Sequence, residues 1–252
     1  MSQCHVASTP VDMASKVAAG APVSDPSEYR SLAGALQYLT MTRPDLAYAA
    51  QRACLHMDDP QDSHLAIIKG ILRYVRGTLH HGLLLPGSSS TYIIAYPDAD
   101  WARCVDIRRL TFGYCVYLGD TLVSWSSKRQ AIVSRSSAEA EYGHVADCVW
   151  LRQLLVEFAI SPPKATAIFC DNVSVVYMST NPVHHRRTKH IELDIHFVQE
   201  KVALGEFRVV HVPMAQQLAD IMTKGLPTSV FQSFRSSLYV SPGIDDTTAV
   251  GC

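Results

Sequence analysis

Four acidic residues stand at positions from which carboxylates can converge on a cation: Asp98, Glu139, Asp171 and Asp220. Asp98 ends the apolar run TYIIAYPD, Asp171 ends the run AIFCD, and the other two lie in helical patterns, SSAEAEYGHVADCVW and QQLADIMTK. Carboxylates from strand ends and helices can meet at one edge of a sheet, where their mutual repulsion favours a hard divalent cation. Mg²⁺ suits such a site because it takes carboxylate, water and phosphate oxygens as ligands. Two such ions can hold the attacking and leaving oxygens of a phosphoryl displacement.

Each acid also has an ordinary structural explanation. Asp98 follows a proline and could belong to a turn, and Asp171 could cap the next helix. Asp220 could be a solvated helix residue, and Glu139 could form a capping box with Ser136.

The phase of the helical pattern distinguishes Glu139 from Glu141. At about 100° per residue, five apolar residues share an arc of roughly 140° that includes Glu139 and excludes Glu141; they are Tyr142, Val145, Ala146, Val149 and Trp150. Glu139 is therefore expected to face the sheet, where a lone carboxylate is unfavourable and a cation shared with other carboxylates would remove the penalty. Glu141 is expected to be solvated.

The segments around these acids predict a mixed sheet with helices on its faces. Residues 91–101 read as a strand, and FGYCVYLGDTLVSWSS reads as two strands joined at Gly119-Asp120, a hairpin signal. RQAIVS could add an antiparallel strand, and the strands ATAIFCDN and FRVVHVP alternate with helical patterns. A meander followed by strand–helix units implies an α/β fold, with a five-stranded mixed sheet over residues 87–227.

The rest of the chain is expected to be helical or irregular. Residues 1–26 read as a linker, residues 27–86 as a small helical unit, and residues 228–252 as a weak helix and a tail. The helix SHLAIIKGILRYVRGTLHHG carries an apolar stripe of Ile68, Ile71, Leu72, Val75 and Leu79, and a separate basic stripe of Lys69, Arg73 and Arg76. The basic stripe is explained by a solvated face of the helix. Contact with a phosphate backbone would require the same stripe.

The composition is that of a folded protein in a reducing compartment. The 252 residues carry a net charge of −1, so nucleic-acid binding would have to come from local basic patches. Seven cysteines without a Cys-x-x-Cys spacing disfavour a disulfide framework or a zinc site. No apolar run reaches the roughly 18 residues that a membrane span needs, and the N-terminus lacks a signal-peptide pattern. We therefore expect an intracellular protein without a membrane partner.

Several long segments closely resemble one family, the Pol polyproteins of copia-type LTR retrotransposons, especially those of plants. YPDADWA, VSRSSAEAEY, FCDNVSVVYMSTNPVHHRRTKHIELDIHFVQEKV and QLADIMTKGLP resemble its ribonuclease H (RNase H) domain. EYRSLAGALQYLTMTRPDLAYA and HLAIIKGILRYVRGT resemble the thumb or connection part of its reverse transcriptase. Together these matches cover about residues 25–240.

The resemblance implies an RNase H-like fold with a four-acid site, in which Asp98, Glu139, Asp171 and Asp220 are catalytic and metal-binding and Asp100 is a neighbour. Asp98 would bridge two Mg²⁺ ions, which Mn²⁺ can replace, and the substrate would be the RNA strand of an RNA–DNA hybrid. The alternative is a catalytically weak remnant that only binds nucleic acid. This alternative is considered because the helix after Glu139 is shorter than is usual in the family by about four residues, which is roughly one turn.

The resemblance also bears on partners. No polymerase palm is recognisable in the sequence, so we expect no DNA synthesis by this chain. The expected partner is the polymerase part of a Pol polyprotein, in the cytoplasm, the nucleus or a virus-like particle.

Two further groups of basic residues are candidates for phosphate contacts. HHRRTKH carries Arg186, Arg187 and Lys189 just before a helix, and Lys128 and Arg129 follow the hairpin. A loop of solvated charge is the alternative for the first group. Zinc binding by the histidines of HHRRTKH is disfavoured, because no cysteine pair accompanies them.

Overall fold

The structure is a computed structural model that describes residues 5–11, 20–87, 90–100, 110–129, 145–181 and 192–243. The chain divides into two compact units, Met1–Leu85 with Lys224–Cys252, and Pro86–Thr223. They are termed the helical unit and the sheet unit below. The chain leaves the helical unit and later returns to it, so the sheet unit is inserted within the helical unit.

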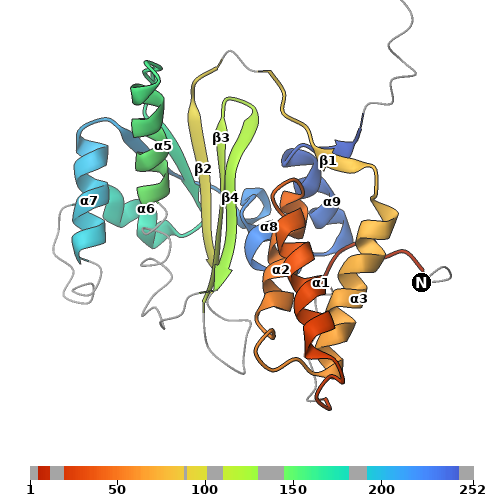
Figure 1. The fold of residues 1–252 in the computed structure, drawn as a ribbon. Coiled ribbons are helices and arrows are strands. Elements are labelled where there is room, and N and C mark those ends of the chain that lie inside the picture. The colour runs from red at the N-terminus through yellow and green to blue at the C-terminus, as the bar shows by residue number, and fades with distance from the viewer. Residues whose placement is uncertain are drawn as a thin grey trace, which may run out of the picture. The chain divides into compact units, whose positions relative to one another are not determined.

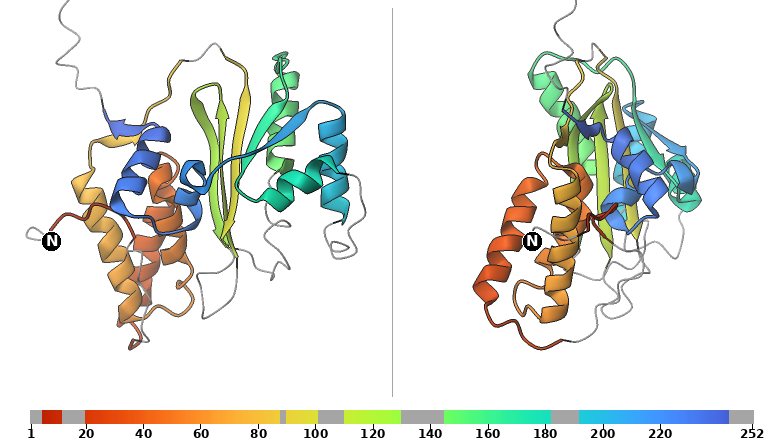
Figure 2. Two further views of the ribbon diagram at one scale, coloured as in Figure 1. Left: turned by 180° about the vertical axis from the view of Figure 1, so that it is seen from behind. Right: turned by 90° about the vertical axis from the view of Figure 1, so that its right-hand side faces the viewer.

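Three α-helices and a 3₁₀ turn form the first part of the helical unit (Figure 2): α1 (Pro26–Leu39), η1 (Pro44–Leu46), α2 (Ala47–Cys54) and α3 (Asp62–Gly77). α1 begins where the Asp25 carboxylate accepts hydrogen bonds from the backbone N–H groups of Ser27 and Glu28. Pro26 occupies the first helical position, where a missing N–H costs nothing. The start of α1 is therefore fixed by residues that are adjacent in sequence.

α3 is amphipathic, but its buried face ends earlier than the sequence predicts. Ile68, Ile71 and Tyr74 are at most 1% exposed. The helix ends one residue before Thr78, whose hydroxyl donates a hydrogen bond to the Tyr74 carbonyl at 3.0 Å. Leu79 lies beyond this cap and is 68% exposed. Its assignment to the apolar stripe is wrong, because the helical period stops where the helix stops.

The C-terminal segment, for which the sequence predicts a weak helix and a tail, belongs to the helical unit. It forms a helix and a short strand that pairs with an earlier strand in an antiparallel sheet: α9 (Thr228–Ser237), β7 (Val240–Pro242) and β1 (His81–Leu83). Phe231 of α9 packs edge-on against Tyr74 with ring centroids 5.6 Å apart, and Arg235 donates a hydrogen bond to the Tyr74 hydroxyl. Tertiary packing thus stabilises a helix whose own sequence signal is weak.

The sheet unit contains the expected five-stranded mixed sheet. Its strands are β2 (Ile93–Asp100), β3 (Thr111–Leu118), β4 (Thr121–Arg129), β5 (Thr166–Cys170) and β6 (Phe207–His211). They lie in the order β4-β3-β2-β5-β6, with β2, β3 and β4 antiparallel and β2–β5 and β5–β6 parallel. The hairpin between β3 and β4 turns at Gly119-Asp120, where Gly119 has a φ of 59°, so this prediction is confirmed. Of the expected strand RQAIVS, Arg129 ends β4 and the other residues lie outside the described part.

Helices cover the two faces of the sheet unequally (Figure 1). One face carries α5 (Val145–Glu157), α6 (Val173–Thr180) and α7 (Glu192–Ala203). The core beneath them includes Ile93, Ala95 and Ile168 from the strands and Cys148 from α5. The other face carries the short helix α8 (Asp220–Thr223), and a 3₁₀ turn, η3 (Met214–Gln216), precedes it in the chain. None of the helices in the described part of the chain is long and apolar enough to cross a membrane.

The last helix predicted from the sequence, over residues 215–225, is divided in the structure. η3 ends at Gln216. The next residue, Gln217, has an extended backbone with φ −77° and ψ 93°, and α8 begins three residues after it at Asp220. The Gln217 side chain is 0% exposed. A tertiary contact of Gln217 therefore interrupts a helix that the local pattern alone would continue.

Candidate metal centre

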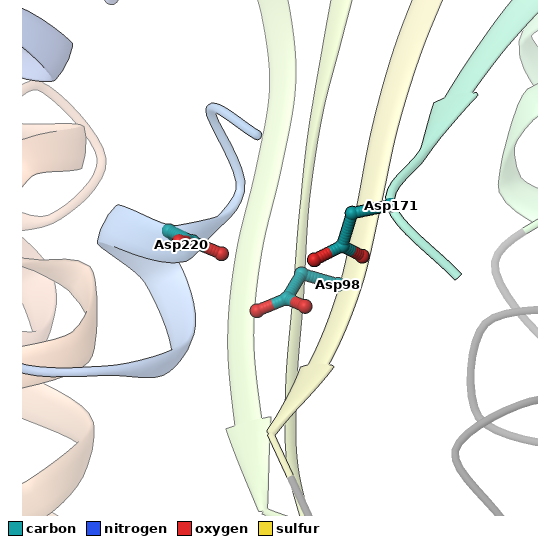
Figure 3. Close-up of side chains that lie close together, drawn as sticks. All are labelled: Asp98, Asp171 and Asp220. Atoms are coloured by element: carbon teal, nitrogen blue, oxygen red, sulfur yellow. The ribbon is translucent and has the colours of Figure 1, made fainter. Parts of the chain in front are cut away.

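Asp98, Asp171 and Asp220 come together at one edge of the sheet (Figure 3). One carboxylate oxygen from each residue lies within 4.8 Å of the others. Asp98 lies near the carboxyl end of β2, and Asp171 follows the last residue of β5, the parallel neighbour of β2. Parallel neighbours end at the same edge of a sheet, so both carboxylates emerge there, and α8 supplies Asp220.

The three carboxylates form a donor set that suits a hard divalent cation. Asp98 and Asp220 are 5% and 4% exposed, and Asp171 is half-buried. Carboxylates at this separation repel one another and are unfavourable to bury in ionised form. A Mg²⁺ ion among them would offset both effects and would keep positions open for water or phosphate oxygens. The residues present therefore fit the cation that the sequence predicts.

Thr223 holds one oxygen of Asp98. Its hydroxyl donates a hydrogen bond to Asp98 Oδ2, and the side chain is 1% exposed. This bond links the end of α8 to β2 beside the candidate ligand. Sequence reasoning missed Thr223 and Gln217, although each stands three residues from Asp220, a spacing that brings side chains together on a helix.

Of the two other acids considered in the sequence, Asp100 and Glu139, the structure describes only Asp100. Asp100 is half-buried, two residues further along β2, and is not one of the three converging carboxylates. Glu139 lies outside the described residues. The apolar arc that directs Glu139 inward is wrong at Trp150, which is 62% exposed, whereas Cys148 and Leu155 are 2% and 6% exposed. The assignment of Glu139 therefore rests on the family resemblance alone.

The predicted phosphate-binding residues lie in separate places. Those of the basic stripe are exposed on α3 in the helical unit: Lys69, Arg73 and Arg76. Those of the HHRRTKH segment lie outside the described residues: Arg186, Arg187 and Lys189. The remaining two end β4, an edge strand of the sheet: Lys128 and Arg129.

The register of the sheet separates Lys128 from Arg129. Arg129 pairs with Thr111 of β3, which in turn pairs with Asp100 of β2. Paired residues share a face of the sheet, and successive residues of a strand alternate between the faces. Arg129 therefore lies on the same face as Asp98, and Lys128 lies on the opposite face. The Arg129 Nε is buried, and among the residues that the structure describes it has no hydrogen-bond partner.

The sequence of this chain matches no protein-family model, but it is similar to several known proteins. It is 46% identical over 226 residues to the retrovirus-related Pol polyprotein from transposon RE1 of Arabidopsis thaliana, and 46% identical over 225 residues to that from transposon RE2 of the same plant. Each match covers 88% of this chain, which spans only 15% and 16% of the length of these two relatives. Among solved structures, it is similar to LC11-RNase H1 in complex with an RNA/DNA hybrid, at 18% identity and a TM-score of 0.39, covering 52% of this chain and 93% of that one. The sequence matches confirm the predicted family: the chain belongs to the retrovirus-related Pol polyproteins of plant transposons.

Proposed function

We propose that the sheet unit is a ribonuclease H, which hydrolyses the RNA strand of RNA–DNA hybrids. The convergence of Asp98, Asp171 and Asp220 within 4.8 Å carries this proposal. Carboxylates gathered in this way suit Mg²⁺, and phosphodiester hydrolysis is a reaction that such ions support. The Pol family of the chain supports the same activity, because the matched segments resemble the RNase H domain of that family.

The proposed centre binds two Mg²⁺ ions, or Mn²⁺ in their place, which would stabilise the attacking and leaving oxygens of the cleaved phosphodiester. Asp98, Asp171 and Asp220 would hold these ions, and Asp98 lies between the other two carboxylates in the view of Figure 3. Glu139 is proposed as the fourth ligand on the resemblance. Thr223 keeps Asp98 oriented through its hydrogen bond to Oδ2, so the carboxylate does not have to reorganise when the substrate binds.

Basic side chains are proposed to hold the hybrid by its phosphates, which fixes its position without reading its sequence. Arg129 shares the face of Asp98, and its Nε has no hydrogen-bond partner among the described residues. The exposed row on α3 is proposed to contact a phosphate backbone in the same manner. The full proposed set is Lys69, Arg73, Arg76, Lys128, Arg129, Arg186, Arg187 and Lys189.

The proposed partner and location follow from the relatives. These are Pol polyproteins of which this chain spans 15% and 16%, so the polymerase part of such a polyprotein is the proposed partner. The proposed location is the compartment in which a hybrid would form, which is the cytoplasm, the nucleus or a virus-like particle.

Cleavage of a labelled RNA–DNA hybrid by the purified chain tests the proposal. We expect cleavage with Mg²⁺ or Mn²⁺ and none in chelator. Asp98→Asn should abolish it, because the change removes a charge from the centre and keeps the shape of the side chain. Asp100→Asn is the matched control on the same strand and should retain activity.

The other outcomes of this experiment are equally specific. Cleavage in chelator would reject the metal mechanism, and equal losses in Asp98→Asn and Asp100→Asn would reject Asp98 as a ligand. A chain that binds the hybrid and leaves it uncut with either ion would reject the nuclease and leave a remnant that only binds nucleic acid.

A further inference from the structure

A proline occupies the central strand of the sheet. Pro97 lies in β2, one residue before Asp98. Proline has no N–H to give to a ladder and is normally confined to edge strands. The last residues paired between β2 and β5 are Ala95 and Ile168. Beyond this pair, in the described strands, ladder bonds do not fix the separation of the two ends that carry Asp98 and Asp171.

The directions of the carbonyl groups show which hydrogen bond is missing. The Tyr92 carbonyl accepts a hydrogen bond on the β3 side, so alternation along the strand turns the Pro97 carbonyl toward β5. The Cys170 carbonyl accepts a hydrogen bond on the β6 side, so the carbonyl of Phe169 turns toward β2. The Phe169 carbonyl therefore faces a residue that cannot donate to it.

The side chain of Gln217 fills this gap. Its carboxamide nitrogen donates to the Pro97 carbonyl at 3.0 Å and to the Phe169 carbonyl at 3.3 Å, and its oxygen accepts the N–H of Ala219 at 3.4 Å. Gln217 is 0% exposed, so water does not compete for these bonds. The ring of Tyr96 stacks on that of Phe169 with centroids 5.1 Å apart, which packs the same two strand ends together.

We propose that Gln217 is a positioning residue of the metal centre: its carboxamide replaces the ladder hydrogen bonds that Pro97 cannot make, and it thereby sets the separation of Asp98 and Asp171. Asp98 follows the first bonded residue, Asp171 lies two residues after the second, and Asp220 lies three residues after Gln217 itself. One side chain thus ties together the three segments that carry the aspartates. The inference rests on the proposed function only in that the three carboxylates bind a metal ion.

Gln217→Met is the first test, because methionine keeps the length of the side chain and removes its donor and acceptor. Binding of Mn²⁺ to the full chain, measured by electron paramagnetic resonance, should weaken about 10- to 100-fold, the usual effect of losing a residue that orients a metal ligand. Gln216→Met is the matched control, since Gln216 is adjacent and exposed, and it should bind Mn²⁺ as the wild type does. Asp98→Asn identifies the fraction of Mn²⁺ binding that belongs to the centre.

Pro97→Ala provides a rescue. Alanine returns a backbone N–H that faces the Phe169 carbonyl, so it can restore the bond that the carboxamide supplies. Combined with Gln217→Met, it should recover most of the lost Mn²⁺ affinity. The free energies of unfolding of the two single variants should also be non-additive in the double-mutant cycle. A side chain that only fills space would give neither result.

The outcomes separate this inference from the proposed function. Wild-type Mn²⁺ affinity in Gln217→Met, or no recovery in the double variant, would overturn the inference. If Gln217→Met does not fold, a double variant that folds and binds Mn²⁺ supports the inference, and one that does not fold overturns it. Neither Mn²⁺ binding nor unfolding requires a substrate. If both measurements give the expected results in a chain that leaves the hybrid uncut, only the proposed function is overturned. A wild-type chain that binds no Mn²⁺ would overturn both.

Discussion

Gly113 of β3 lies directly opposite Asp98 of β2, and α8 occupies the space above it. A Cβ at position 113 would lie 2.4 Å from the Met222 Cβ and 3.1 Å from the Thr223 Cγ2. Both side chains are buried, at 0% and 1% exposure, so neither can move aside into solvent. The absence of a side chain at Gly113 therefore lets α8 bring Asp220 close to the acid-bearing strand.

Gly113→Ala should push α8 away from the sheet. The added methyl group overpacks a filled site, which typically costs about 1–3 kcal/mol. We expect the free energy of unfolding in urea to fall by this amount, and Mn²⁺ binding to weaken because Asp220 moves away from the other two carboxylates. Gly34→Ala in α1 is the control, because a Cβ there meets nothing within 4 Å. Unchanged Mn²⁺ affinity in Gly113→Ala would contradict this account of how α8 is placed.

The strands could be predicted from the sequence because their signals are local. The alternating run that ends near Asp98 and the turn at Gly119-Asp120 need no distant contact, and β2, β3 and β4 follow them closely. The ends of helices were harder to predict. Leu79 continues the apolar period of α3 beyond the cap at Thr78, and Gln217 leaves a helical backbone to bond two strand carbonyls. The conflict at Gln217 is of the kind expected near a functional site.

The candidate site could be predicted in part. Asp98, Asp171 and Asp220 were recognisable because each stands at a strand end or in a helical pattern. The distance between them, however, depends on Gly113, which is far in sequence from Asp171 and Asp220. The prediction that Glu139 faces the sheet depends on the burial of the apolar residues that share its side of the helix. Exposed apolar side chains are common on protein surfaces, so the exposure of the tryptophan in α5 could not be read from the pattern.

The basic row on α3 should contribute to the salt dependence of binding. Lys69, Arg73 and Arg76 are exposed at spacings that place them along one side of the helix. Replacing all three with glutamine should reduce the slope of log affinity against log salt for an RNA–DNA hybrid by up to about 3 units, roughly one for each lost phosphate contact. Exchanging Lys69 for arginine and the two arginines for lysine preserves the charge and should preserve the slope. Fluorescence anisotropy at several salt concentrations measures it, and an unchanged slope in the glutamine variant would identify the row as a solvated helix surface.

His64 should make the stability of the helical unit depend on pH. Its side chain is 8% exposed, and Nδ1 accepts the backbone N–H of Gln61 at 3.0 Å, which closes the cap of α3. Burial lowers the pKa of His64, and Asp59 opposes part of this shift. The imidazole pKa in an unfolded chain is about 6.5, so below that pH the unfolded chain takes up the proton more readily. The contribution of His64 to the free energy of unfolding should be fully present above about pH 6.5. It should be lost as the pH drops toward the lower pKa of the folded state.

Urea unfolding of the full chain at a series of pH values checks this dependence. His64→Asn offers an oxygen that can accept the same N–H and does not titrate, so it should reduce the slope below about pH 6.5. Part of the slope should remain, because burial, together with Arg235 and Arg43, also lowers the pKa of His81. Adding His81→Asn should flatten the profile further. A slope that is the same in all three chains would assign the pH dependence to other groups.

α5 turns Cys148 and Leu155 toward the core, at 2% and 6% exposure, and turns Trp150 outward at 62%. The two buried residues lie seven apart in sequence, which is about 20° short of two full turns at about 100° per residue. Counting seven residues back from Cys148 gives Glu141, whereas Glu139 lies nine back, about 180° away in the same period. Both acids lie outside the described residues. A helix continued backward with this period would assign the fourth carboxylate to Glu141, whereas the family resemblance assigns Glu139.

The paired variants Glu141→Gln and Glu139→Gln separate the two assignments, since they make the same chemical change two residues apart. If the resemblance is right, Glu139→Gln should weaken Mn²⁺ binding and lower cleavage of a labelled hybrid about a hundredfold, the scale of loss when catalytic geometry is disturbed, and Glu141→Gln should retain both properties. If the period of α5 extends to the acids, the two variants should exchange these results. Urea unfolding of each variant shows whether a loss comes from folding instead. A larger loss in Glu139→Gln would show that the period of α5 does not extend to the acids and would support the resemblance, and activity near the wild-type level in both variants would exclude both as ligands.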